Sequence, residues 1–167
     1  VFIASGHNEN PLARIYGCAK QNGIDTIVRV THDKIFVDPN LILNFVSKFK
    51  EKSLDYLYSS DFIPGTAFEI MSLASIAKAK QQFIDKNIEH ISYAIKAVTD
   101  NQLKLPLDTH YDLKDLRLLV DYPEDVKLMD LIFSCLGPLC TLEQVIALLN
   151  DNPWLKGVNK LPLVTVY

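Results

Sequence analysis

Hydrophobic and polar residues follow two alternating patterns along the chain. Short runs of β-branched and other apolar residues are separated by longer stretches in which apolar residues recur every three or four positions. The first pattern is typical of buried strands and the second of amphipathic helices, so their alternation predicts a layered α/β fold. Strands are expected at 1–4, 25–30, 54–58, 68–71 and 116–120.

The expected helices begin at capping signals. Asn10-Pro11 and Asp38-Pro39 each combine a capping side chain with a proline that suits the first helical turn. Thr141, with Gln144 three positions later, forms the pattern of a capping box. Further helices are expected near 73–82, 87–99 and 123–135.

Bulk composition narrows the class of protein. The chain has 167 residues, 49% of them hydrophobic and 22% charged, which is the balance of one ordinary globular domain. The net charge is −3 and the lysines and arginines are scattered, which argues against a nucleic-acid partner. No apolar run approaches the roughly 18 residues of a membrane span. The cysteine count of 3 without a C-x-x-C pair favours a reducing, cytoplasmic location over a disulfide framework or zinc site.

Two aspartates stand directly after expected strands. Asp33 follows the strand at 25–30, and Asp121 follows the strand at 116–120. Ligands of open α/β sheets gather at such strand ends, and two convergent carboxylates suit Mg²⁺, which takes its other ligands from water and phosphates. The alternative is structural, because an aspartate after a strand is commonly a turn former or a helix cap. Asp121 is placed to cap the helix that follows it.

Several motifs resemble one enzyme family. Residues 27–33 (I-V-R-V-T-H-D), continued by 37–39 (V-D-P), resemble the I-V-R-I-T-G-D … I-D-P segment of the SpsF-like cytidylyltransferases. These belong with the acylneuraminate and 3-deoxy-manno-octulosonate cytidylyltransferases. The resemblance covers about residues 1–160, and motifs in this order are together fairly specific. Further matches pair 12–16 with L-x-R-Y-Y, 68–70 with V-E-V, 89–92 with E-H-V-T, and 117–125 with R-W-T-V-D-T-P-E-D.

The resemblance implies both a fold and an activity. The fold is a three-layer nucleotide-diphospho-sugar transferase-like sheet with helices on both faces, lacking its N-terminal strands. The activity is that of a nucleotidyltransferase, which uses CTP and Mg²⁺ to activate a sugar or sugar acid and releases pyrophosphate, here for surface polysaccharide biosynthesis. By position, Asp33 and Asp121 match the metal-binding aspartates of the family. No catalytic residue is assigned.

Four further residues are candidates for substrate binding: Arg29, Glu69, His90 and Arg117. The two arginines suit anionic groups of a substrate, but arginines in strands also serve as internal ion-pair partners. His90 would contact the sugar or act as an ordinary hydrogen-bonded helix histidine. The same alternatives stay open for Glu69.

The chain departs from the family pattern at several positions. His32 replaces a glycine, Ala67 replaces an acidic residue, and Ile88 replaces an arginine. These changes indicate either a different sugar substrate or a decayed site. The family's glycine-rich basic phosphate loop lies upstream of everything matched here, so we expect negligible catalysis from this sequence alone.

The two ends suggest a longer polypeptide. The chain begins at Val1 without a methionine, and residues 161–167 (L-P-L-V-T-V-Y) resemble the first strand of a family 2 glycosyltransferase. We therefore expect a partial cytidylyltransferase-like domain at 1–156, then a linker and the start of a glycosyltransferase domain at 157–167. The alternative function is a non-catalytic scaffold or dimerisation module attached to that glycosyltransferase. A sheet edge exposed by missing strands would favour a homo-oligomer.

Overall fold

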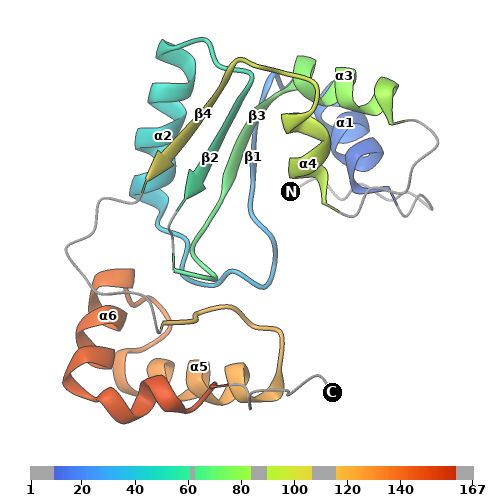
Figure 1. Cartoon of the computed structure of the whole chain (residues 1–167). Helices are drawn as coiled ribbons and strands as arrows, with labels where there is room; N and C mark the ends of the chain where they lie inside the picture. Colours follow the sequence, from blue (N-terminus) through green and yellow to red (C-terminus); the bar gives the residue numbers. More distant parts are fainter. Residues whose placement is uncertain (1–9, 61–62, 84–89, 107–115, 161–167) are drawn as a thin grey trace. The chain divides into compact units, whose positions relative to one another are not determined.

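The computed structural model describes residues 10–60, 63–83, 90–106 and 116–160. Its elements belong to two compact units, each assembled from segments that are not consecutive in the sequence (Figure 1). Unit 1 comprises Val1–Arg29, Asn40–Ser59 and Phe68–Leu105, and unit 2 comprises Val30–Pro39, Ser60–Ala67 and Pro106–Tyr167. Within the described ranges, no helix has the length and apolar character needed to cross a membrane.

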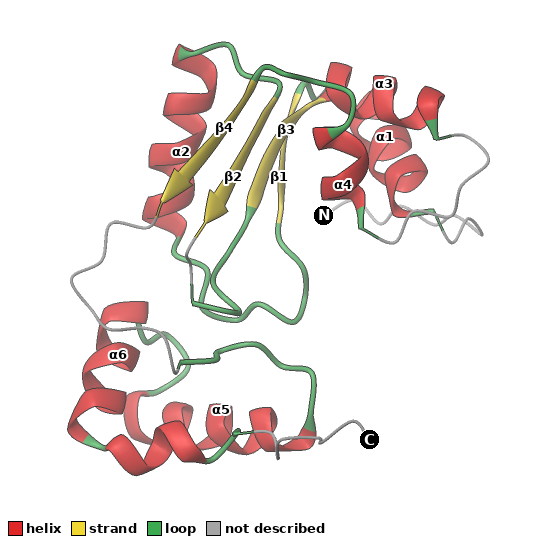
Figure 2. Cartoon of the chain, in the orientation of Figure 1, coloured by secondary structure: helices red, strands yellow, loops and turns green. Residues whose placement is uncertain are grey.

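Unit 1 contains a mixed four-stranded sheet in the order β1-β3-β2-β4 (Figure 2). Strand β3 runs antiparallel to both β1 and β2, and its register places Glu69 opposite Arg29 on one side and Tyr58 on the other. The strands are β1 (Thr26–Arg29), β2 (Tyr56–Ser60), β3 (Glu69–Ser72) and β4 (Gln102–Pro106).

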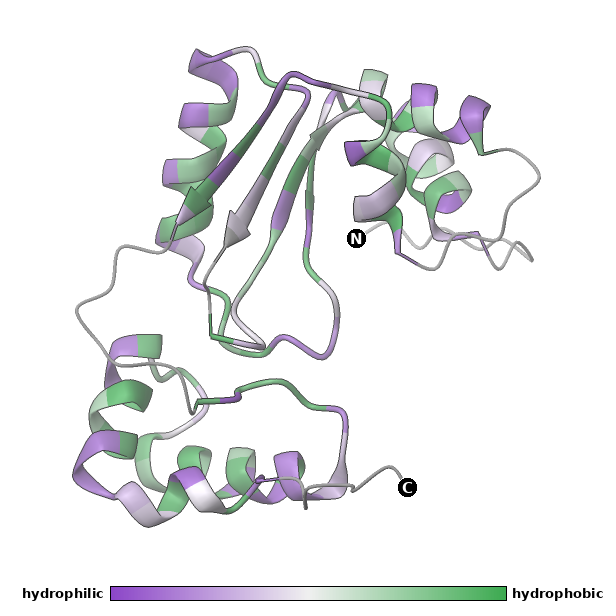
Figure 3. Cartoon of the chain, in the orientation of Figure 1, coloured by the Kyte–Doolittle hydropathy of each residue, from purple (hydrophilic) through white to green (hydrophobic). Residues whose placement is uncertain are grey.

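Helices cover both faces of this sheet. On one face, the ring of Phe45 in α2 lies 5.2 Å from that of Phe68, and the apolar side of α2 is turned toward the sheet (Figure 3). On the other face, Tyr56 and Met71 are fully buried in a cluster with apolar residues of α1, α3 and α4. The helices are α1 (Pro11–Gln21), α2 (Pro39–Glu51), α3 (Leu73–Gln82) and α4 (Ile91–Lys96).

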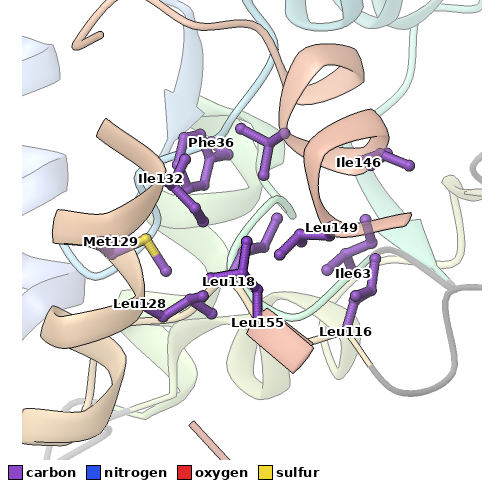
Figure 4. Packing of buried hydrophobic residues seen from close by; sticks show 11 residues of the cluster. Phe36, Ile63, Leu116, Leu118, Leu128, Met129, Ile132, Ile146, Leu149 and Leu155 are labelled. Atoms are coloured by element: carbon purple, nitrogen blue, oxygen red, sulfur yellow. The ribbon is translucent and has the colours of Figure 1, made fainter. Parts of the chain in front are cut away.

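Unit 2 is built around the extended segment 116–120. Leu116 and Leu118 from this segment enter a hydrophobic core made with three helical elements (Figure 4). Those elements are α5 (Pro123–Leu136), α6 (Leu142–Asp151) and the 3-10 helix η1 (Pro153–Gly157). The buried core consists of Phe36, Ile63, Leu116, Leu118, Leu128, Met129, Ile132, Val145, Ile146, Leu149 and Leu155.

A glycine permits the close approach of two backbones in unit 2. The N–H of Leu118 donates to the carbonyl of Pro64 at 2.7 Å. Gly65 has a φ of +100°, and a Cβ on it would lie 2.1 Å from the carbonyl oxygen of Leu118. Only glycine fits here, because it tolerates the positive φ and leaves room for the neighbouring chain.

The α/β fold with helices on both sheet faces is confirmed, and so are the helix starts near residues 11, 39, 73, 123 and 142. The side chain of Asn10 accepts hydrogen bonds from the backbone of the first turn of α1. Thr141 and Gln144 form the expected capping box of α6. The strands expected at 25–30, 54–58 and 68–71 correspond to β1, β2 and β3, with ends shifted by one or two residues, as is usual for element boundaries.

Other expectations are wrong. Segment 116–120 forms no strand of the described sheet; Leu119 instead makes an isolated antiparallel bridge with Lys34. Strand β4 was not predicted, because Lys104 and Pro106 argue against a central strand. Both residues suit the edge of the sheet, which is where β4 lies. Of the helix expected at 87–99, residues 87–89 lie outside the described ranges, and the described helix α4 ends earlier, at Lys96.

Some predictions concern residues outside the described ranges. The strand at 1–4 and the glycosyltransferase-like run at 161–167 are among them. The boundary between 156 and 157 stays a prediction. Beyond it, Asn159 is buried and hydrogen-bonded to Arg117 and Asp125, so unit 2 continues at least that far.

Candidate functional site

The predicted site residues fall into two groups. Arg29, Glu69 and His90 belong to unit 1, whereas Asp33, Arg117 and Asp121 belong to unit 2.

In unit 1, Glu69 is the centre of a polar cluster on the sheet. The Oε2 atom of Glu69 accepts a hydrogen bond from Nη1 of Arg29 at 2.8 Å, and Oε1 accepts one from the hydroxyl of Tyr56. The side chain of Ser92 on α4 is a further hydrogen-bond partner. Glu69 is 9% exposed, so its carboxylate is satisfied by protein groups rather than by solvent.

These contacts keep Glu69 ionised. Burial by itself raises the pKa of the Glu69 carboxyl, but hydrogen bonds from Ser92, Tyr56 and Arg29, with the positive charge of Arg29, bring it below the ordinary 4.5. Burial and the negative charge of Glu69 raise the pKa of Tyr56 above the ordinary 10.0. Tyr56 therefore stays protonated and donates to a carboxylate that is ionised at neutral pH.

The cluster extends along β2 toward α4. The ring of Tyr58 stacks on Tyr56 with centroids 5.2 Å apart, and Nζ of Lys96 lies 3.8 Å from the centre of the Tyr58 ring. The side chain of Arg29 is 23% exposed, which leaves part of it accessible to an anionic ligand. Two cations and one carboxylate give this part of the sheet a net positive charge.

His90 and Ser92 of the 89–92 motif lie in different environments. His90 is exposed and is the N-cap residue of α4, without a side-chain capping hydrogen bond. Ser92, two positions later, is the residue of the motif that reaches Glu69. The sequence signal for Ser92 was its place in the E-H-V-T match. Tyr56 offered no signal beyond strand alternation.

In unit 2, Arg117 joins two carboxylates. Its Nη2 atom lies 3.0 Å from Oδ2 of Asp121 and 3.0 Å from Oδ2 of Asp125. Asp125 is fully buried, and the same oxygen accepts hydrogen bonds from the backbone N–H groups of Asp121 at 3.0 Å and Tyr122 at 2.9 Å. These contacts make Arg117 an internal ion-pair partner, which is the structural alternative for this residue.

The start of α5 also differs from the capping expected for Asp121. Tyr122 is the N-cap residue, and the side chain that accepts the capping hydrogen bonds is that of Asp125. Burial by itself raises the pKa of Asp125. Hydrogen bonds from the Asp121 backbone, Asn159 and the Tyr122 backbone, with the charge of Arg117, lower it by more, so the pKa lies below the ordinary 3.8. Asp125 thus caps α5 as a carboxylate, and Asp121 points its carboxylate to Arg117 instead.

The two predicted metal-binding aspartates lie on neighbouring segments. The N–H of Val120 donates to the carbonyl of Asp33 at 3.1 Å, next to the bridge between Lys34 and Leu119. Because this bridge is antiparallel, Asp33 lies opposite Val120, the residue before Asp121. The side chain of Asp121 is 46% exposed.

Asp33 carries an unsatisfied carboxylate oxygen. Its Oδ1 atom is buried and has no hydrogen-bond partner among the described residues. Burial by itself raises the pKa of this carboxyl. Hydrogen bonds from the Thr31 hydroxyl and the Asp33 backbone, with the charges of Lys34 and His32, lower it by more, so the pKa lies below the ordinary 3.8. Asp33 is therefore negatively charged at neutral pH with one oxygen left without a partner.

The residues present would supply Mg²⁺ with two carboxylates, one from Asp33 and one from Asp121. Among the described residues, no group of three or more His, Cys, Asp or Glu side chains gathers to hold an ion. Mg²⁺ needs only one or two carboxylates, because water and phosphate complete its octahedron. A buried, unpaired oxygen on Asp33 and a half-exposed carboxylate on Asp121 are compatible with that arrangement.

Comparisons with known proteins agree with the fold. No family model matches the chain. It is 26% identical over 166 residues to an uncharacterized protein of Methanocaldococcus jannaschii, a match that covers 95% of this chain and 67% of that protein. A solved structure of a cytidylyltransferase from Leptospira borgpetersenii serovar Hardjo-bovis superposes with a TM-score of 0.80 at 23% identity, covering 94% of this chain and 68% of the other. The chain thus shares the α/β fold of that solved structure and spans about two thirds of each matched protein.

Proposed function

We propose that the chain is part of a cytidylyltransferase that activates a sugar or sugar acid with CTP and releases pyrophosphate. The observation that carries this proposal is the pairing of the segments that bear Asp33 and Asp121, joined by the hydrogen bond from Val120 to Asp33. A bound cation would satisfy the buried carboxylate oxygen of Asp33, which has no hydrogen-bond partner among the described residues. The fold likeness to a cytidylyltransferase supports the choice of nucleotide.

The chemistry requires little more than positioning and charge neutralisation. A sugar hydroxyl oxygen forms a bond to the α-phosphorus of CTP, and its proton is released to solvent. The bond from the α-phosphorus to the α,β-bridging oxygen breaks, and pyrophosphate leaves with that oxygen and the electron pair. Mg²⁺, when bound by Asp33 and Asp121, would offset the negative charge of the phosphates. Arg117 keeps the Asp121 carboxylate in place at 3.0 Å, so the role we propose for Arg117 is to hold a metal ligand.

The cluster around Glu69 is our candidate for contact with the sugar. Arg29 is fixed by its ion pair with Glu69 and remains partly exposed, and Lys96 adds a second positive charge. A preoriented guanidinium suits a carboxylate or phosphate better than a mobile one, because less side-chain entropy is lost on binding. His90 is exposed at the start of α4 and stays a candidate for the same ligand.

The wider role that we propose is surface polysaccharide biosynthesis in the cytoplasm. The resemblance of residues 161–167 to a glycosyltransferase strand is its motivation, since a following domain would use the activated sugar. A homo-oligomer belongs to the same proposal. The competing function, a non-catalytic scaffold, is favoured by the substitutions at His32, Ala67 and Ile88.

The test measures pyrophosphate release by the full-length protein from CTP, Mg²⁺ and a panel of sugars and sugar acids. We expect Asp33→Asn and Asp121→Asn each to lower turnover on the order of 100-fold or more, because each removes a charged metal ligand. Asp130→Asn, at an exposed position on α5, is the matched control and should leave turnover unchanged.

Two results would contradict the proposal. Turnover that survives in both metal-site variants would remove Asp33 and Asp121 from the mechanism. Calorimetry that detects no binding of CTP with Mg²⁺ to the full-length protein would instead favour the scaffold.

A further inference from the structure

Asn159 is buried although it follows the last helical element of unit 2. It is 5% exposed, and its Nδ2 atom donates to the carbonyl of Arg117 at 2.9 Å and to Oδ1 of Asp125 at 2.9 Å. These partners lie 42 and 34 positions away in the sequence. An amide nitrogen carries two hydrogens, so one side chain satisfies both acceptors.

The two partners of Asn159 are the residues that hold Asp121. Arg117 contacts the Asp121 carboxylate at 3.0 Å through Nη2. Asp125 accepts the backbone N–H of Asp121 at 3.0 Å and pairs with the same Nη2 of Arg117. Asn159 therefore binds both residues that contact Asp121, through the main-chain carbonyl of Arg117 and through the side chain of Asp125.

We propose that Asn159 is a positioning residue for the metal ligand Asp121, an inference that rests on the proposed function. Asn159 joins the backbone at Arg117 to the side chain of Asp125 and so sets the distance between the extended segment and the start of α5. Arg117 contacts the Asp121 carboxylate, and Asp125 contacts the Asp121 backbone N–H. Groups that orient a metal ligand through hydrogen bonds commonly change metal affinity by about 10- to 100-fold when they are removed.

The chemistry of position 159 is restrictive. Alanine would leave the Arg117 carbonyl and Oδ1 of Asp125 without their donor, although Oδ2 of Asp125 would keep its backbone partners at the start of α5. Aspartate would place a second carboxylate beside Asp125. Serine keeps a single hydroxyl donor, which can serve only one of the two acceptors.

The experiment uses Mn²⁺ alone as a paramagnetic probe on the 167-residue chain. Broadening of the backbone amide signals of residues 31–34 and 119–122 is titrated by NMR, which detects weak binding without nucleotide or turnover. We expect Asn159→Ala to weaken Mn²⁺ binding by about 10-fold and Asn159→Ser by less.

Asn152→Ala is the matched control. Asn152 also lies in unit 2 and also donates its Nδ2 to a backbone carbonyl, that of Leu148 at 3.1 Å, but neither Asp125 nor Arg117 is its partner. We expect this variant to keep the Mn²⁺ affinity of the parent chain within about twofold. If both variants weakened Mn²⁺ binding equally, a general loss of stability in unit 2 would explain the effect of Asn159→Ala. That result would overturn the inference.

Asp121→Asn separates failure of this inference from failure of the proposed function. If the parent chain shows no Mn²⁺ site at these amides, or if Asp121→Asn leaves the site intact, the metal assignment is wrong and the inference falls with it. If Asp121→Asn abolishes the site but Asn159→Ala binds Mn²⁺ normally, only the positioning role is wrong. Should Asn159→Ala not fold, Asn159→Ser decides, because normal affinity in that variant contradicts the proposal.

Discussion

In each unit, a buried carboxylate faces an arginine, and the two carboxylates are held in different ways. Glu69 in unit 1 pairs with Arg29 at 2.8 Å, and Asp125 in unit 2 pairs with Arg117 at 3.0 Å. The partners of Glu69 come from β1, β2 and α4, elements distant in the sequence. Most partners of Asp125 lie within eight positions of it, and the exception is Asn159.

The difference shows what each carboxylate contributes. Glu69 links two strands and a helix, so its contacts exist only when the sheet and α4 are assembled. Asp125 caps the helix that begins beside it, and such local contacts form at a smaller cost in chain entropy. The contacts of Glu69 therefore depend on the assembled unit 1, whereas Asp125 sets the local geometry around Asp121.

The largest expected effect comes from Asp125→Ala. It leaves Arg117 without its buried partner and removes the cap of α5, and breaking a buried ion pair costs about 3 kcal/mol or more. Urea unfolding followed by the fluorescence of Trp154, the single tryptophan and a residue of η1, measures this loss in unit 2. Asp130→Ala, exposed on the same helix, should change stability by less than about 0.5 kcal/mol. Equal stability of the two variants would contradict the assigned role of Asp125.

Glu69→Gln is expected to cost about 2 kcal/mol, because glutamine keeps a hydrogen-bonding group but removes the charge opposite Arg29. The pKa of Glu69 is lower in the folded state than its ordinary 4.5, so its contribution is complete above that pH and is lost as the pH falls through the folded-state pKa. The same holds for Asp125: its contribution to stability is complete above pH 3.8 and is lost as the pH falls through its folded-state pKa. As the pH falls from 5 to 3, the denaturant midpoint should therefore decrease less in Glu69→Gln than in the parent chain. An equal decrease in both proteins would contradict this prediction.

Tyr56→Phe should cost about 1 kcal/mol at neutral pH through the lost hydrogen bond to Glu69. Because the pKa of Tyr56 is raised above its ordinary 10.0 in the folded state, the stability linked to its proton is present below pH 10 and declines as the pH rises further. The variant should lose less stability than the parent chain between pH 9 and pH 11, measured by circular dichroism. Tyr93→Phe, whose ring is 71% exposed, should retain the parental decline.

The smallest effect is expected for Lys96→Met, which removes the cation from the face of Tyr58 and keeps an apolar stem of similar length. Exposed contacts of this kind contribute about 0.5 kcal/mol. Lys104→Met on β4, away from any described aromatic contact, is a suitable comparison in the same unfolding assay. A larger loss for Lys104→Met would mean that the lysine–tyrosine contact does not stabilise unit 1.

Part of the candidate site was visible in the sequence. Arg29 and Glu69 were singled out separately, and the register of β1 and β3 makes them direct partners. Asp33 and Asp121 were expected to come together through neighbouring strands of one sheet. Their segments do meet, but through an isolated bridge. Tyr56 and Asn159 were missed because a side chain that serves a distant partner leaves no periodic pattern.

The capping of α5 shows why a local motif can mislead. Asp121 and Asp125 both precede or open the helix, and both are residues that suit a helix N-terminus. Which of them caps depends on the direction of each side chain. Both carboxylates contact Nη2 of Arg117, but the Asp125 carboxylate is also held by Asn159 and by the backbone N–H groups of Asp121 and Tyr122, which makes it the capping group.

The sequence by itself determined where helices begin, which of their faces are apolar, and that strands alternate with helices. Those properties depend on hydrogen bonds and side-chain spacing within a few residues. Only the tertiary structure decided that segment 116–120 pairs beside Asp33, that Glu69 is enclosed by groups from three elements, and that Asn159 supports Asp125. These arrangements join residues tens of positions apart, and a buried charge takes its partner from whichever segments the packed core brings within hydrogen-bonding distance.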